Sequence, residues 1–288
     1  MKKIFLKLFI VITFFSCEEM STVIDLDLPQ HESLLVVYTT PISENETKIY
    51  VASSLDPLSN DDFEYLNNAL VTIKNSDQID TATFFNVDTL DPYYIGSPLK
   101  QGYSYELEVA HDNFLKASSN LIVPNRVPVV EFYIDSIYED AIPLSFTIED
   151  PLENNFYRLK FEVKKGNKWK RVSFESYDPT FDGGGFIDDS YGGRSVYFTD
   201  QLFNNSQKQF NIELDVNYQI DSIKLNLFTI SESYYNYHIS RKLQNRNENN
   251  PLNDLLGAEP VVVYNNINNG FGVFGIRVKN DSIIPVIY

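Results

Sequence analysis

The sequence of 288 residues holds 23 Lys and Arg against 40 Asp and Glu, which gives a formal net charge of −17. A chain this acidic lacks the general basic face that binds DNA, RNA or anionic lipid headgroups, so we expect no nucleic-acid partner. The single cysteine excludes an internal disulfide and a zinc–thiolate site, and the 19 Tyr and 21 Phe favour strands.

Residues 1–16 have the layout of a secretory signal peptide: lysines, then an apolar stretch, then the small residue Ser16. With Cys17 next, the segment resembles a bacterial lipoprotein signal, in which Cys17 becomes the first residue and carries a diacylglyceryl thioether and an acylated amine. Two or more acyl chains anchor a protein stably in a membrane. The alternatives are an uncleaved membrane helix, which needs about 20 apolar residues, and an ordinary buried thiol at Cys17.

Residues 17–30 are predicted to form a tether and a first strand. Short apolar runs bounded by Pro, Asn, Asp and Gly then follow one another, which is typical of a β-sandwich. We therefore predict an immunoglobulin-like domain over residues 22–124, with strands at 34–38, 47–52, 69–74, 81–87 and 103–109.

Pro124 and Pro128 mark the domain boundary, because two prolines this close cannot continue a central strand. A second β domain is predicted over residues 129–288, so the fold class is all-β. Its strands are expected at 129–134, 144–148, 156–163, 169–174, 196–198, 210–214, 223–230, 260–264 and 271–276.

One short helix is expected after Ser231, which can cap it, with Glu232 in the first turn. Apolar residues then recur at helical spacing on one face: Tyr235, Ile239 and Leu243. The glycines that follow, at positions 270, 272 and 275, indicate a bent strand that packs its phenyl rings into the core; the alternative is a contact surface for a partner.

The sequence contains no nucleophile elbow and no zinc-protease helix, so we expect no enzyme activity. The histidines are His31, His111 and His238, and His238 is expected to be a partly buried helix residue. A surface hydrolase that uses Asp188 and Asp189 is an alternative, although adjacent strand residues point to opposite faces.

An acidic, Gly-rich loop offers a candidate Ca²⁺ site, because hard oxygen ligands on a flexible loop suit that ion. The alternative is a solvated acidic loop, since the closing Glu of a twelve-residue calcium loop is absent. The candidate ligands are Asp178, Asp182, Asp188 and Asp189.

Asp followed by Ser or Thr and a small or apolar residue occurs five times, where composition predicts about one occurrence. The pattern resembles the O-glycosylation sequon of exported Bacteroidota proteins, and it is also how a turn enters a strand. The acceptors would be Thr81, Thr89, Ser136, Ser222 and Ser282. Two tyrosine runs, at 93–94 and 234–237, are candidates for sugar or peptide binding, with core packing as the favoured interpretation.

Three parts of the chain carry a resemblance to a known family. They are Cys17-Glu18-Glu19 with the segments 24–29 and 35–38, the segment Asn68–Ile73, and the C-terminal Asn-Ile…Gly-Phe-Gly-Val-Phe-Gly element within 259–275. Together they resemble the domain-of-unknown-function 4249 family of Bacteroidota lipoproteins over nearly the whole mature chain. The sequence departs from that pattern at Asn268-Asn269, where a Gly pair is expected.

The resemblance implies an outer-membrane lipoprotein encoded near TonB-dependent receptors, with no catalytic residues to carry over. The acidic residues after Cys17 resemble the signal that sends such lipoproteins to the cell surface. We therefore expect a surface-exposed, lipid-anchored, non-enzymatic accessory of a TonB-dependent outer-membrane receptor. The alternative is a stand-alone adhesin that binds a glycan or a peptide.

Overall fold

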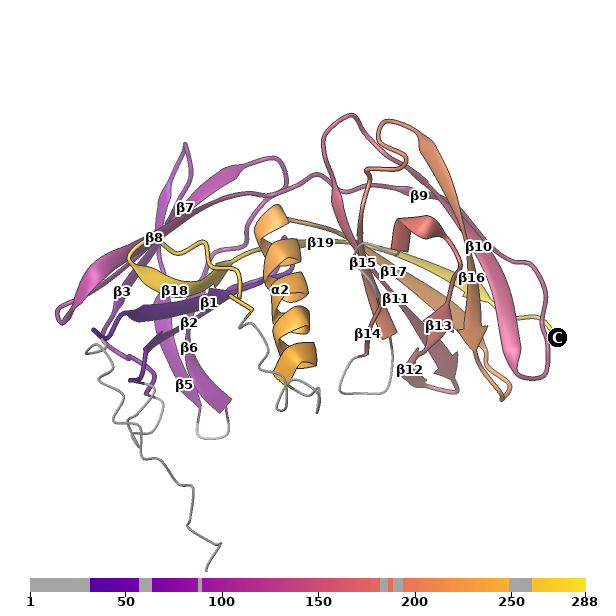
Figure 1. The fold of residues 1–288 in the computed structure, drawn as a ribbon, viewed down its shortest axis with the longest axis horizontal. Helices are drawn as coiled ribbons and strands as arrows, with labels where there is room; N and C mark the ends of the chain where they lie inside the picture. Colours follow the sequence, from indigo (N-terminus) through magenta and orange to yellow (C-terminus); the bar gives the residue numbers. More distant parts are fainter. Residues whose placement is uncertain (1–31, 57–63, 88–89, 182–185, 189–193, 249–260) are drawn as a thin grey trace, which may run out of the picture. The chain divides into compact units, whose positions relative to one another are not determined.

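The computed structural model describes residues 32–56, 64–87, 90–181, 186–188, 194–248 and 261–288. Within these ranges the chain is built from β-strands, with one α-helix, α2 (Glu232–Glu248), and one 3₁₀ turn, η2 (Pro179–Phe181) (Figure 1). The all-β prediction is confirmed. None of the described helical segments combines the length and apolarity needed to cross a membrane.

The first sandwich is immunoglobulin-like in that two largely antiparallel sheets pack face to face around one core. Its five-stranded sheet has the order β18 (Gly270–Phe274), β1 (Leu35–Thr39), β2 (Thr47–Ser53), β6 (Leu90–Gly96) and β5 (Thr83–Val87). Its four-stranded sheet has the order β4 (Ile79–Thr81), β3 (Leu70–Lys74), β7 (Ser104–His111) and β8 (Phe114–Ile122).

Period-two alternation explains the core of this sandwich. Leu35 and Val37 of β1 are fully buried, while Val36 and Tyr38 between and after them are only partly covered. The opposite sheet contributes its own alternating apolar residues, so the two inner faces meet in one cluster that includes Val71, Ile73, Leu107 and Val109.

The second sandwich also packs two sheets face to face. One has the order β13 (Phe174–Glu175), β16 (Gln207–Asp215), β10 (Ala141–Glu149) and β9 (Val129–Ile134). The other has the order β14 (Phe186–Asp188), β15 (Arg194–Thr199), β11 (Phe156–Lys165), β17 (Ser222–Ile230) and β19 (Arg277–Pro285), with β12 (Lys168–Val172) paired to β11.

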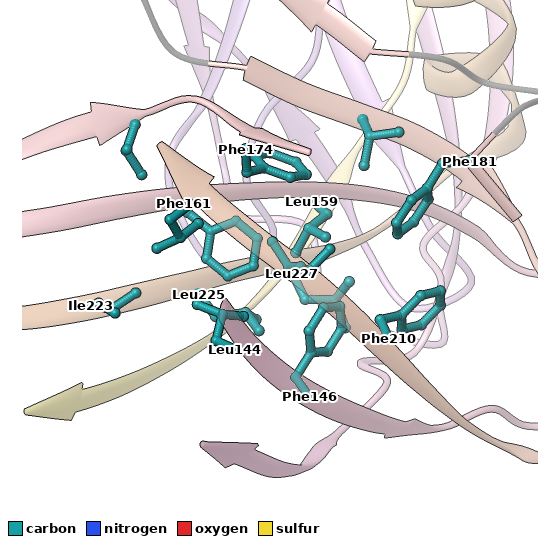
Figure 2. Packing of buried hydrophobic residues seen from close by; sticks show 14 of the residues in the cluster. Leu144, Phe146, Leu159, Phe161, Phe174, Phe181, Phe210, Ile223, Leu225 and Leu227 are labelled. Atoms are coloured by element: carbon teal, nitrogen blue, oxygen red, sulfur yellow. The ribbon is translucent and has the colours of Figure 1, made fainter. Parts of the chain in front are cut away.

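Aromatic rings fill the core of the second sandwich. Figure 2 shows Phe146 and Phe210 side by side, with their ring centroids 5.0 Å apart and nearly parallel. Phe161 meets Phe174 edge-on at 5.0 Å, and both are fully buried. Leu159, Leu225 and Leu227 complete the centre of the cluster (Figure 2), so this core rests on ring packing with aliphatic filling.

The C-terminal segment divides between the two sandwiches, which corrects the expectation that residues 129–288 form one domain. The boundary at Pro124–Pro128 does separate the cores, because Val123 packs in the first and Val127 in the second. β18, however, returns to the first sandwich and pairs in parallel with β1 (Figure 1). β19 then pairs with β17 of the second sandwich.

Both sandwiches belong to a single contact unit, Ser33–Tyr288. The connector between them is tied to the second sheet at Val127, whose N–H donates to Thr229 Oγ1 at 3.2 Å and whose carbonyl accepts from Asn280 Nδ2 at 2.8 Å. The start of β19 is tied to the first sandwich, since Arg277 N donates to Pro41 O at 3.0 Å.

The helix begins as predicted. Ser231 Oγ accepts the N–H of Tyr234 at 3.2 Å, which is an N-cap, and it also accepts the N–H of Ile276 at 3.1 Å. Ser233 Oγ donates to Phe274 O at 2.8 Å. The first turn of α2 is therefore fastened to the segment that follows β18.

The expected strand at 260–264 is wrong for its described part, since residues 261–264 form no strand. Tyr264 instead donates its N–H to Ser240 Oγ of α2 at 2.8 Å, so this segment is bonded to the helix and is not part of a sheet. Among the described strands, four lie where the pattern predicted none, namely β6, β8, β14 and β19. β19 carries a polar run, Lys279–Ser282, and β6 contains Pro92, and both features obscure alternation.

A Gly272→Ala substitution tests the close pairing of β18 and β1. Gly272 has φ of +120°, and a Cβ there would lie 2.0 Å from Val37 O. The backbones must separate to accept it, so we expect a loss of about 3 kcal/mol or more in the free energy of unfolding, measured by denaturant titration of the full chain.

Gly166→Ala is the matched control. Gly166 also has a positive φ, of +60°, but a Cβ there would meet nothing within 4 Å, so the loss should be only about 1 kcal/mol. Equal losses at the two positions would show that the strands are not in close contact.

Candidate functional site

The outer face of the five-stranded sheet carries aromatic rings where a solvated antiparallel sheet normally carries polar side chains. Tyr38 on β1, Tyr50 on β2 and Tyr93 on β6 follow one another across the strands, and Phe85 on β5 continues the row. Successive ring centroids lie 6.4, 5.8 and 5.4 Å apart. These are contact distances for aromatic pairs, so the rings form one continuous row.

Two further rings extend the row. Tyr65 lies 6.4 Å from Tyr50, and Tyr237 of helix α2 lies 5.8 Å from Tyr38. We call the six rings together the tyrosine face: Tyr38, Tyr50, Tyr65, Phe85, Tyr93 and Tyr237. Tyr93 is buried and Phe85 is 41% exposed, while the others are partly exposed.

A depression of about 780 Å³ opens beside Tyr38 and Tyr50. Lys48 and Arg277 bring positive charge to its lining, and Glu44 brings negative charge. Aromatic walls with a few charged groups at the edge are the usual composition of a ligand site.

The phenol groups suit recognition. Burial raises the pKa of Tyr237, and it also raises that of Tyr65, with the neighbouring Asp91 adding to the effect. Both phenols are therefore neutral at physiological pH. A surface of rigid rings with hydroxyl tips offers large contact area with little loss of side-chain entropy.

The two tyrosine runs of the sequence divide between core and surface. Tyr94 lies in the first core, where its hydroxyl accepts the N–H of Ala69 at 2.8 Å and donates to Leu66 O at 3.0 Å. Tyr93 next to it faces outward. Tyr234 is buried, while Tyr237 joins the tyrosine face.

Tyr38 and Tyr50 were not among the candidate binding residues predicted from the sequence. They lie far from Tyr93 in the sequence, and only the strand order brings the three rings together. The available signal was the alternation of each strand, which places both tyrosines on the outward face.

The candidate calcium ligands are only partly described. Asp178 pairs with Lys208 at 2.8 Å and accepts the N–H of Thr180 at 2.9 Å. Burial raises the pKa of Asp178, but these hydrogen bonds outweigh it and the net pKa is lowered. Asp188 lies in β14, opposite Arg194, and Asp182 and Asp189 lie outside the described residues. In the part of the chain that the structure describes, no three acidic, His or Cys side chains gather as a metal site requires.

In three of the five Asp-Ser/Thr triplets, the Asp side chain has a hydrogen-bond partner within the described residues. Asp80 accepts the N–H of Ser97 at 2.6 Å, Asp221 accepts that of Gly166 at 2.6 Å, and Asp135 accepts the hydroxyl of Ser145 at 2.7 Å. Of the acceptor residues, Thr81 is exposed, while Ser136, Ser222 and Ser282 are partly exposed. Thr89 and the lipidation residue Cys17 lie outside the described residues. Glycosylation and lipidation stay predictions.

His238 is enclosed by rings rather than by polar partners. Its ring lies 4.3 Å from Tyr234, 5.4 Å from Tyr197 and 5.4 Å from Tyr237, and its Nε2 is buried without a hydrogen bond. Burial first, and then the charges of the nearby arginines, Arg158 foremost, together lower the pKa of His238 to about 3. The side chain therefore packs as a neutral ring under α2.

Comparison with known proteins gives one family. A family model described as a domain of unknown function (DUF4249) matches residues 21–281. No protein with a curated description matches the sequence.

Among solved structures, the chain is similar at 10% identity to chitinase ChiA74 from Bacillus thuringiensis, with 67% of this chain and 29% of that chain covered and a TM-score of 0.21. It is similar at 9% identity to the collagen adhesin (CNA) from S. aureus, with 86% and 93% covered and a TM-score of 0.24. The collagen binding domain of Erysipelothrix rhusiopathiae surface protein RspB gives 7% identity, 87% and 95% coverage, and a TM-score of 0.22. The chain thus spans less than a third of the chitinase, and TM-scores of this size transfer no function.

We expect His238 to weaken the fold in acid. The unfolded chain takes up a proton near pH 6.5, whereas the folded pKa is about 3, so stability falls as pH drops through this window. Between pH 7 and pH 5 the loss should be about 2 kcal/mol. His238→Phe keeps a ring and removes the proton, so its unfolding free energy should fall less over this range, as measured by denaturant titration at each pH.

His111→Gln is the control, because His111 is partly exposed and its hydrogen bonds are to the surface residues Asn68 and Asn113. That variant should keep the wild-type pH dependence. If His238→Phe kept it as well, His238 would not be the neutral buried group that the structure describes.

Proposed function

The chain belongs to the DUF4249 family, and we propose that it is a non-enzymatic binding protein, anchored through Cys17 in the outer membrane and exposed at the cell surface, that serves a TonB-dependent transporter as an accessory. The observation that carries the binding role is the tyrosine face. The signal-like N-terminus supports the anchor, and the resemblance of the sequence to outer-membrane lipoproteins supports the partner.

The tyrosine face is better suited to contact with a protein partner than to exposure to solvent. Large exposed apolar surfaces on soluble domains mark interaction sites, and tyrosine is among the residues that dominate binding energy at protein interfaces. The rings are tilted by 50° to 57° across Tyr38, Tyr50 and Tyr237, so the surface is uneven rather than flat. An uneven aromatic surface suits the side chains of a receptor loop.

The non-enzymatic part of the proposal is supported by the surroundings of the candidate catalytic groups. Asp178 is paired with Lys208, and His238 is packed among rings with a pKa far below neutrality. Neither group is poised to exchange a proton with a substrate at neutral pH.

We expect a gentle-detergent pull-down of the full-length protein from its own outer membrane to recover a TonB-dependent receptor in stoichiometric amount. The double variant Tyr38→Ser, Tyr50→Ser removes two central rings and should reduce that recovery about tenfold or more, because each buried aromatic anchor contributes about 2 kcal/mol. The readout is quantitative mass spectrometry of the recovered proteins.

Tyr177→Ser is the matched control, since Tyr177 is 99% exposed and lies on the second sandwich. It should leave receptor recovery unchanged. Recovery of the protein alone at native expression levels would contradict the accessory role. Equal recovery of the receptor by the double variant would show that the tyrosine face does not contribute to receptor binding.

A stand-alone adhesin is the second candidate. The depression beside Tyr38 and Tyr50 favours it, because aromatic walls with Lys48 and Arg277 at the edge suit a sugar or a peptide. Binding of a glycan or peptide to the purified full chain, measured without any receptor present and lost in the same double variant, would favour the adhesin over the accessory.

A further inference from the structure

The loop between β1 and β2 borders two depressions. One is the depression of about 780 Å³ beside Tyr38 and Tyr50, which we now call the aromatic depression. The other has a volume of about 520 Å³ and lies where the connector between the sandwiches meets the start of β19; we call it the polar depression. Ile42, Glu44 and Asn45 line both, so the two depressions adjoin along this loop.

Glu44 has a backbone conformation that normally requires glycine. Its φ is +69°, in the left-handed region. The surrounding hydrogen bonds hold it there: the N–H of Glu44 donates to Leu99 O at 3.0 Å, and Ser43 Oγ donates to the same oxygen at 2.8 Å. Ser43 N also donates to Arg277 O at 2.8 Å. Backbone strain that is fixed in this way is common at binding sites, and here it fixes a side chain that borders both depressions.

The charges of the polar depression are paired. Glu44 Oε2 lies 3.9 Å from Arg126 Nη2, and Glu44 Oε1 accepts from Gln101 Nε2 at 3.1 Å. Lys279 and Asp281 form a second ion pair. A charged ligand would therefore meet both signs of charge in this depression and gain little net attraction.

The aromatic depression is balanced in the same way. Lys48 and Arg277 are its cations, and Glu44 and Glu46 are its acids. Because Glu44 is shared, the two depressions together have four cations and three acids. The near balance favours a ligand without net charge, in contrast to the strongly acidic chain as a whole.

The uncharged lining groups of the polar depression suit hydroxyl groups. The amides of Asn45, Gln101 and Asn280 line it. An amide presents a donor and an acceptor side by side, and neighbouring hydroxyl groups of a sugar offer the matching pair. A peptide would need apolar pockets for its side chains, and the aliphatic lining is limited to Ile42 and the buried Val278.

The aromatic depression offers what the other lacks, which is ring surface. Tyr38 and Tyr50 are both partly exposed, with ring centroids 6.4 Å apart and ring planes tilted by 50°. The face of an aromatic ring carries negative charge density and attracts the C–H groups on the flat side of a sugar. Rings on one side of Glu44 and paired polar groups on the other are therefore complementary to the two surfaces of a sugar chain.

We propose that the two depressions form one binding site for a neutral oligosaccharide. One sugar unit packs against Tyr38 and Tyr50, and further units are hydrogen-bonded around Glu44 and by the amides of the polar depression. The inference rests on the binding role proposed for the tyrosine face, and it names the ligand class at the edge of that face. It does not require the receptor.

The test is calorimetric titration of the full-length protein, purified in a detergent without a sugar headgroup. The probes are maltohexaose, cellohexaose, xylohexaose and mannohexaose, each with its disaccharide. We expect at least one hexasaccharide to bind saturably, with an affinity about tenfold or more above that of its disaccharide, because only the longer chain reaches both depressions. Raising sodium chloride from about 50 mM to about 500 mM should change the affinity less than about twofold, since the ligand is uncharged.

Glu44→Gly separates a binding role from a structural one. Glycine adopts the backbone conformation at position 44 without strain, so the unfolding temperature should equal or exceed that of wild type. The same change removes the carboxylate from both depressions, so the affinity for the hexasaccharide should fall about tenfold or more. Asn205→Gly is the matched control, because Asn205 also has a positive φ, of +59°, and is exposed on the second sandwich. It should leave the affinity unchanged.

Three results would overturn the proposal. The first is the absence of saturable heat with all four hexasaccharides in the wild-type protein, which requires no variant to fold. The second is equal affinity in Glu44→Gly and wild type. The third is saturable binding of a random hexapeptide pool or of hexagalacturonate in preference to the neutral sugars, which would assign a peptide or an acidic ligand instead. The receptor pull-down uses none of these measurements, so the two proposals fail separately.

Discussion

The parallel pairing of β1 with β18 is the contact on which the rest of the structure depends. This pairing joins β1, the first strand described in the chain, to β18, which begins at Gly270. The two backbones can approach this closely only because β18 carries glycines where they meet. A Cβ at Gly270 would lie 2.6 Å from Leu35 O, and a Cβ at Gly275 would lie 3.0 Å from the Cβ of Tyr234. Glycine thus sets the approach of β18 to the first sheet and of helix α2 to β18.

The tyrosine face depends on this pairing. Helix α2 is fastened through Ser231 and Ser233 to the residues around Phe274, which places Tyr237 against Tyr38 and completes the tyrosine face. β19 begins directly after β18, so Arg277 reaches the depression on the first sandwich while it also contacts the Phe228 ring of the second. The segment from β18 to the start of β19 therefore connects the two sandwiches.

The sequence predicts local structure well and long-range contacts poorly. Alternation located strands such as β2 and β7, the pair Pro124–Pro128 located the boundary, and Ser231 located the helix start, because each depends on neighbouring residues. The return of β18 to β1 was not visible, since no local pattern encodes its partner. The same holds for the tyrosine face, whose members are adjacent only through strand order and register.

The C-terminal closure also sets an order of events for the newly made protein. Leu35 can pair with Gly270 only after almost the whole chain has been synthesised, and a contact of such sequence separation forms slowly. Strand β1 of the N-terminal sandwich must therefore remain an unpaired sheet edge until the rest of the chain has been synthesised. A premature stop codon anywhere before position 270 would damage the first sandwich as well as the second, and the unpaired edge of β1 would be a place for a chaperone to bind.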